Sequence, residues 1–75
     1  MTEREILGIA ELRVFWVESV REHGESSCEE VLSRLRKTGR TPKGDSHKAR
    51  IRNVHSAANH HPDLVKTAPG RFGLR

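Results

Sequence analysis

The stretch Thr41–Ala58, TPKGDSHKARIRNVHSAA, decides the fold that we predict for this chain of 75 residues. It is a short polar turn that leads into a basic helix. Thr41 and the proline after it offer an N-cap hydroxyl and a proline at the first helical position. Gly44, however, is unfavourable inside a helix. We therefore expect the helix to begin after Gly44, with Asp45 or Ser46 as its N-cap.

This basic helix has two unlike faces. Ile51, Val54 and Ala58 recur three and four residues apart and form one apolar stripe. Arginine can pair with guanine edges, asparagine with adenine, and small residues permit close approach to a DNA groove. The alternative is a solvated amphipathic helix whose charges only keep the chain in solution. The face opposite the stripe carries Ser46, Ala49, Asn53 and Ser56, flanked by Arg50 and Arg52.

The net charge of +4 at pH 7 is the sum of two unlike halves. Residues 1–35 hold eight glutamates and four arginines, which gives −4. Residues 36–75 hold ten lysines and arginines against two aspartates, which gives +8. One basic end is typical of a polyanion binder. A chain that meets an acidic protein partner would carry the same asymmetry, and composition does not separate the two.

Two further helices are expected before the basic one. Thr2 and Glu5 have capping-box spacing, so the first helix could begin almost at the N-terminus. Gly8 interrupts it, and residues 1–9 are therefore expected to be a helical extension or a separate turn. Gly24 should end this helix as its C′ residue.

The second helix is bounded by serines and by a glycine. Ser26 or Ser27 should cap it, and Ser27 with Glu30 repeats the capping-box spacing. Its first turn is acidic and its last turn basic, which suits the helix dipole. Gly39 should end it.

After the basic helix the pattern changes to that of a hairpin. Residues 64–68 and 71–74 are expected to be strands joined by a Pro-Gly turn. Phe72 and Leu74 should point inward with Val65 opposite them, and because a lone hairpin is marginal in water, it should pack near Trp16. The predicted class is mostly α with a small terminal β-hairpin, in the order of a winged helix-turn-helix with three helices plus wing.

Some chemistry is not expected. The single Cys28 and the lack of a signal peptide fit a reducing cytoplasm, and a bacterial chain would associate with the nucleoid. Five histidines with one cysteine lack the short ligand spacings of a zinc site. We found no Gly-rich phosphate loop, nucleophile elbow or paired carboxylates in the basic half. We therefore expect no enzyme, no cofactor and no metal, and neither a membrane partner nor a small-molecule substrate.

Two motifs resemble a known family. The turn Gly39–Pro42, GRTP, resembles the Gly-basic-Thr-Pro turn that precedes the third helix of HARE-HTH winged-helix domains. The run Leu64–Arg75, LVKTAPGRFGLR, resembles the phrase that closes them, Phe/Leu-Val-Arg/Lys, then Pro-Gly, then aromatic-X-Leu-Arg. The match covers about half of the chain well and the first half by pattern only. One departure is that the turn, with Gly44 and Asp45, is a residue longer.

Such domains occur fused to restriction endonucleases, in chromatin proteins, and as the N-terminal domain of the delta subunit of bacterial RNA polymerase. The resemblance implies one winged-helix domain over residues 1–75 that binds DNA or docks on a DNA-bound machine.

We therefore predict a protein that binds double-stranded DNA, a small transcriptional or DNA-associated regulator. The alternative is a protein-interaction module that docks on a polymerase or nuclease and forms a homodimer through Ile6, Leu7 and Ile9. In the DNA hypothesis the groove is met by Arg50, Arg52, Asn53 and Ser56, phosphates near the helix start by Lys43, Ser46 and Lys48, and phosphates at the wing by Lys66 and Arg71.

Overall fold

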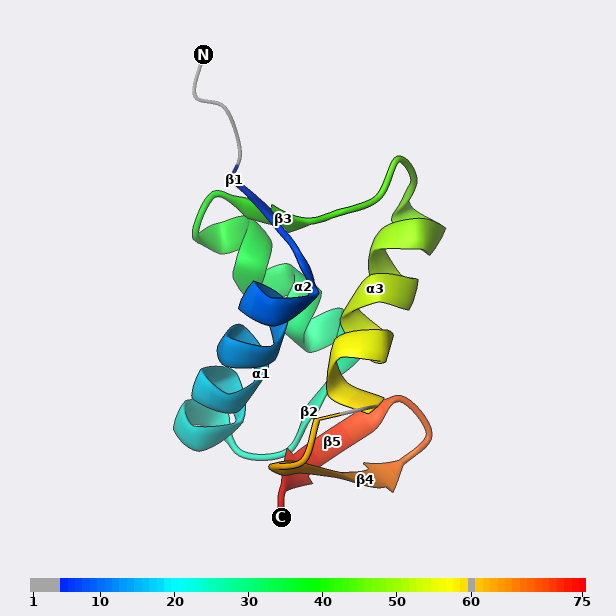
Figure 1. Cartoon of the computed structure of the whole chain (residues 1–75). Helices are drawn as coiled ribbons and strands as arrows, with labels where there is room; N and C mark the ends of the chain where they lie inside the picture. The colour runs from blue at the N-terminus through cyan, green and yellow to red at the C-terminus, as the bar shows by residue number, and fades with distance from the viewer. Residues whose placement is uncertain (1–4, 60) are drawn as a thin grey trace.

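The computed structural model describes residues 5–59 and 61–75, which fold into three helices and five short strands (Figure 1). The predicted class, mostly helical with a terminal hairpin, is confirmed. In chain order the elements are β1 (Glu5–Leu7), α1 (Ile9–His23), β2 (Ser26–Ser27), α2 (Cys28–Lys37), β3 (Arg40–Pro42), α3 (His47–Asn59), β4 (Leu64–Ala68) and β5 (Arg71–Leu74).

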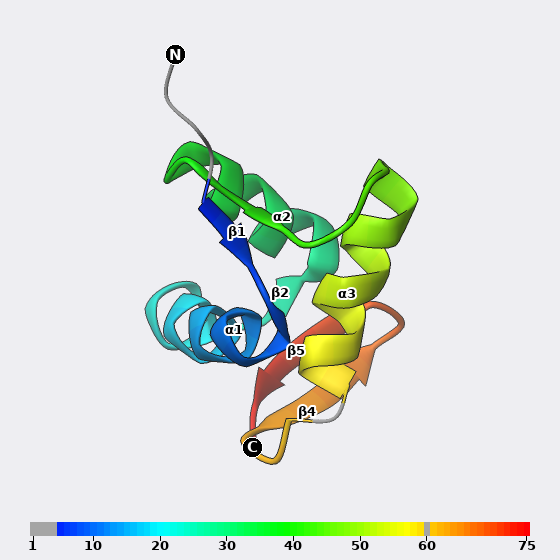
Figure 2. The ribbon, with the colours of Figure 1, turned by 45° about the horizontal axis from the view of Figure 1, so that its top comes forward.

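The helices lie between two small sheets, one at each end of the molecule (Figures 1 and 2). β4 and β5 form the terminal hairpin, and β2 adds to the free edge of β5, so the antiparallel strand order is β2-β5-β4. At the other end β1 runs parallel to β3. This second sheet joins the N-terminal strand to the segment just before α3, and therefore holds that segment from one side.

Local signals set the helix boundaries. The expected capping box of α2 is confirmed: the Glu30 N–H donates to Ser27 Oγ at 3.1 Å, and the Ser27 N–H donates to Glu30 Oε1 at 3.0 Å. Gly24, with φ 81°, follows the last residue of α1, and its N–H donates to the Val20 carbonyl at 2.7 Å. Gly39, with φ 76°, comes one residue later, after Thr38, the C-cap of α2, and its N–H donates to the Arg36 carbonyl at 3.1 Å. Glycine adopts this conformation without a Cβ penalty, so these chain reversals follow from the sequence.

The core is centred on Trp16, which has no exposed surface. Its ring meets the Phe72 ring edge to face, with 5.4 Å between centroids, so the predicted packing of the hairpin on α1 is confirmed. The indole N–H donates to the Val54 carbonyl of α3 at 2.9 Å. The His55 ring also meets the Phe72 ring edge to face, with 5.7 Å between centroids. One tryptophan thus joins α1, α3 and β5.

The prediction for residues 1–9 was wrong where the structure describes them. Residues 5–7 are a strand, and α1 begins only at Ile9, because the Glu5 N–H bonds to the Gly39 carbonyl and the Lys43 N–H to the Leu7 carbonyl. Residues 1–4 lie outside the described part of the chain. Leu7 is 3% exposed and belongs to the core, so it cannot take part in a dimer surface.

The two strands of the hairpin were predicted correctly, but Val65 and Leu74 do not point inward as predicted. Phe72 is buried, but Val65 and Leu74 are 41% and 43% exposed. The register pairs Val65 with Gly73, which places Val65 on the face opposite to Phe72. A shift of one residue exchanges the two faces of a strand. Leu64 is the residue of β4 that is buried instead.

The capping box of α2 gives a test of local stability. Changing Ser27 to alanine should lower the free energy of unfolding by about 1 kcal/mol, because the Glu30 N–H loses its acceptor. Chemical denaturation followed by circular dichroism measures this change. Ser33→Ala, at an exposed position within the same helix, is the matched control and should not destabilise the fold. Equal stabilities of the two variants would contradict the role of the cap.

Candidate nucleic-acid interface

The segment before α3 is organised by a cap and a glycine. As expected, helix α3 begins after Gly44, and the Ser46 hydroxyl accepts from the Ala49 N–H at 3.2 Å. Gly44 has φ 148°, and a Cβ built on it would lie 2.8 Å from the Arg50 backbone nitrogen. Only glycine therefore fits between this turn and the first turn of the helix.

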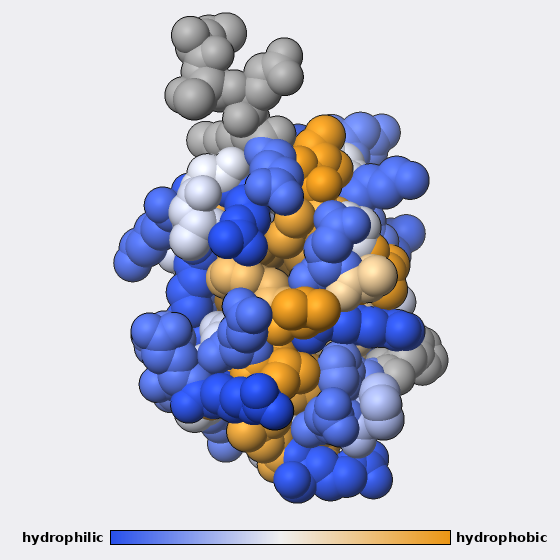
Figure 3. All heavy atoms as spheres, turned by 60° about the vertical axis from the view of Figure 1, so that its left-hand side comes forward, coloured by the Kyte–Doolittle hydropathy of each residue, from blue (hydrophilic) through white to orange (hydrophobic). Residues whose placement is uncertain are grey.

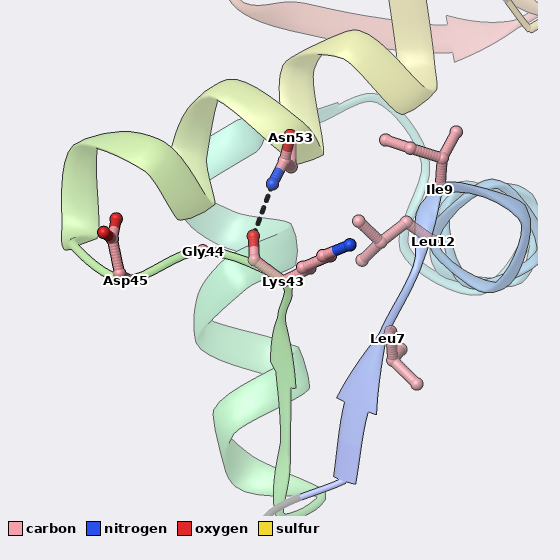
Figure 4. Close-up of a pocket in the computed structure, with 7 residues that line it drawn as sticks. All are labelled: Leu7, Ile9, Leu12, Lys43, Gly44, Asp45 and Asn53. Atoms are coloured by element: carbon pink, nitrogen blue, oxygen red, sulfur yellow. Dashed lines mark hydrogen bonds between the residues drawn. The ribbon is translucent and has the colours of Figure 1, made fainter.

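Two side chains of α3 bind back to the same turn. Arg50 Nε donates to the Gly44 carbonyl at 3.1 Å, and Asn53 Nδ2 donates to the Lys43 carbonyl (Figure 4). We call this pair of hydrogen bonds the turn clamp. It uses one N–H of each side chain and leaves the two terminal nitrogens of Arg50, and the amide oxygen and second amide N–H of Asn53, for other partners. Both residues are therefore held in place, with less freedom than an open groove-facing side chain would have.

The outer surface of α3 carries cations without carboxylates. No Asp or Glu occurs in the helix, and within residues 5–59 and 61–75 none of its lysines or arginines forms an ion pair with a carboxylate. Of the predicted DNA-binding residues, Lys43, Ser46, Lys48, Arg52 and Lys66 are exposed, while Arg50, Asn53 and Ser56 are half-buried.

Arg71 differs from the prediction. Its Nε donates to Glu25 Oε1 at 2.7 Å and its Nη1 to Glu30 Oε1 at 3.2 Å. These bonds lower the pKa of the Glu25 carboxyl, chiefly through the Arg71 hydrogen bond, and Arg71 adds to the lowering of the Glu30 pKa that the Ser27 hydrogen bonds begin. The guanidinium is thus already neutralised by two carboxylates and is not a free phosphate ligand.

The hairpin turn lies on the same side of the molecule as α3 in both ribbon views (Figures 1 and 2). The Cys28 N–H at the start of α2 donates to the Gly70 carbonyl in this turn at 3.1 Å. The Cys28 thiol itself is buried, and burial, with a smaller contribution from Glu29, raises its pKa. The turn is therefore tied to α2, and the exposed Lys66 is the hairpin cation that is left for a partner.

One contact at the start of α3 was not predicted. Arg36 is near the end of α2, and its Nη2 lies 3.4 Å from His47 Nδ1. On the other ring nitrogen, His47 Nε2 lies 3.9 Å from Glu29 Oε1. Arg36 therefore adds a cation beside the first turn of α3. The sequence shows Arg36 as a basic residue in the last turn of α2, but the prediction explained the basic residues of that turn by the helix dipole alone.

Among residues 5–59 and 61–75, no three His, Cys, Asp or Glu side chains gather as metal ligands would. In the same part of the chain, no helix has both the length and the apolar character needed to cross a bilayer. No family model, curated protein or solved structure matches the chain. The functional assignment therefore rests on the residues described above.

Gly44 provides a test of the turn. Gly44→Ala should destabilise the fold by about 2–6 kcal/mol, since backbone strain in this conformation costs about 1–3 kcal/mol and the close contact with Arg50 adds about 1–3 kcal/mol. The control is Gly70→Ala, whose Cβ would meet nothing within 4 Å, so that only strain remains. Urea denaturation gives both values. A loss no larger for Gly44→Ala than for Gly70→Ala would contradict the steric role.

The Arg71 ion pairs predict a dependence of stability on pH. Because the pKa values of Glu25 and Glu30 are lowered on folding from 4.5, their contribution is fully present above that value and is lost as the pH falls through the lowered values. Arg71→Gln should therefore reduce the fall in melting temperature between about pH 5 and pH 3. Lys66→Gln removes an exposed cation from the same hairpin and should leave this fall in melting temperature unchanged. If the melting temperatures of the two variants fall equally on acidification, the Arg71 ion pairs do not contribute to the pH dependence.

Proposed function

We propose that this chain is a winged helix-turn-helix domain. The order of three helices followed by a hairpin supports this class. So does the three-stranded sheet in which β2, between α1 and α2, joins the edge of the hairpin. In this assignment α2 and α3 are the helix-turn-helix pair, α3 is the recognition helix, and β4 with β5 is the wing.

On this basis, the function that we propose is binding of double-stranded DNA through α3, as a small transcriptional or DNA-associated regulator. The observation that carries the proposal is the charge of α3: Lys48, Arg50 and Arg52 lie on one helix without a carboxylate, and none of the three forms an ion pair within residues 5–59 and 61–75. A cation that has no ion pair, such as the exposed Lys48 or Arg52, can release the counterions of phosphates without first breaking one. A solvated helix of the usual kind mixes both signs of charge.

The residues have different roles in this proposal. Arg52 is exposed and free to reach a base edge, and Asn53 keeps its amide oxygen and one amide N–H for a base while the turn clamp is closed. Lys43, Lys48 and Lys66 would contact phosphates, which position the protein without selecting sequence. Ser46 caps the helix, and Arg71 holds the hairpin to α2, so we assign neither a direct contact with DNA.

Fluorescence anisotropy with labelled duplexes tests the proposal. Arg52→Ala should weaken binding by about 1–3 kcal/mol if the guanidinium meets a base. Lys66→Ala should lower the slope of log affinity against log salt by about 0.9, as expected for the loss of one phosphate contact. Arg21→Ala removes an exposed arginine from the last turn of α1 and is the control that should change neither value. No binding to random or genomic duplexes at low salt would reject the function.

The alternative, docking on a polymerase or nuclease, has one observation in its favour. Ile6 and Val14 are 64% and 59% exposed, and apolar side chains form an interrupted strip over the face of the molecule shown in Figure 3. Of the three residues predicted to form a homodimer, Leu7 is buried, and Ile6 and Ile9 are exposed. Gel filtration with and without duplex DNA separates the two functions at about 0.15 M salt, where exposed charges are screened beyond about 8 Å. A dimer whose elution volume is the same with and without DNA would support docking.

A further inference from the structure

A hollow of about 630 Å³ lies between the start of α1 and the turn that precedes α3 (Figure 4). Its volume falls within the range of small-molecule sites, about 300–1,000 Å³. Apolar side chains of β1 and α1 line one side, and the turn and α3 line the other. The residues around it are Leu7, Ile9, Leu12, Lys43, Gly44, Asp45 and Asn53.

One cation reaches into this hollow. In Figure 4 the Lys43 side chain extends from the turn towards Leu12, while Asp45, which also lines the hollow, lies beyond Gly44. Within the described part of the chain Lys43 forms no ion pair with a carboxylate. The Lys43 ammonium therefore has no carboxylate of the described chain to neutralise it. The apolar wall beside it is open to a ligand. An anion with an apolar body would neutralise the ammonium and cover the wall.

We propose that this hollow binds a small amphipathic carboxylate. Its carboxylate would pair with the Lys43 ammonium, and its hydrocarbon body would lie on Ile9, which is 37% exposed, above the buried Leu7 and Leu12. The hollow also touches the turn clamp, since Asn53 and the Lys43 carbonyl are both at its edge. A bound anion would neutralise Lys43 next to α3. It would therefore compete with DNA, an effect that rests on the proposed function.

Decanoate is a suitable probe, with decanol as the neutral control. In ¹⁵N–¹H spectra of the full chain, decanoate should shift the amide signals of Ile9, Leu12, Lys43 and Asn53. Lys43→Gln should weaken decanoate binding by about tenfold, the factor that corresponds to about 1.4 kcal/mol, and should leave decanol binding unchanged. Ile9→Asn should weaken both. Lys48→Gln, which removes an exposed cation outside the hollow, should weaken neither.

The result that overturns the proposal is decanoate binding that does not respond to Lys43→Gln, or shifts that do not map to these residues. Decanoate should also lower the affinity for duplex DNA in the wild type, and should do so less in Lys43→Gln. If decanoate binds as described and no duplex binds under any condition, the proposed function fails while the ligand site stands. If duplex binds and decanoate does not, the ligand site fails alone.

Discussion

The hydrogen bond from the Trp16 indole to the Val54 carbonyl is the contact on which the arrangement of this small domain depends. It joins the middle of α1 to the middle of α3, and the Phe72 ring on the edge of the same indole adds the hairpin. A chain of this length buries only about 60–65% of its unfolded surface. A core this small is organised around one aromatic side chain, Trp16. The orientation of α3 depends on its contact with that side chain.

The surface that this arrangement presents is divided by how its cations are used. Arg71 is held between two carboxylates, and Arg34 donates to Ser19 Oγ at 2.6 Å and to Ser26 Oγ at 2.7 Å. These arginines join elements to one another. Among the described residues, the lysines and arginines of α3 form no such bridge between elements, apart from the hydrogen bond of Arg50 to Gly44. A basic composition thus contains two populations, and only the unpaired one supports binding to a polyanion.

Much of the fold could be predicted from the sequence because its signals are local. Ser27 and Glu30 are three residues apart, and Gly24 and Gly39 act on the helix that each one follows, so both ends of α2 were correct. The strand β1 was missed because it exists only through its pairing with β3, some 35 residues away. Arg71 was misjudged for the same reason, since its partners are 41 and 46 residues distant. The face of Val65 depended on a register that no local pattern fixes.

The position of Cys28 has a practical consequence. Its thiol is covered by the core and its own N–H is bound by the hairpin turn. A thiol-reactive dye can therefore attack only when the core around Cys28 opens. The labelling rate of this one cysteine, followed over time in native buffer, would report how often that end of the domain opens, a local fluctuation that can be distinguished from global unfolding.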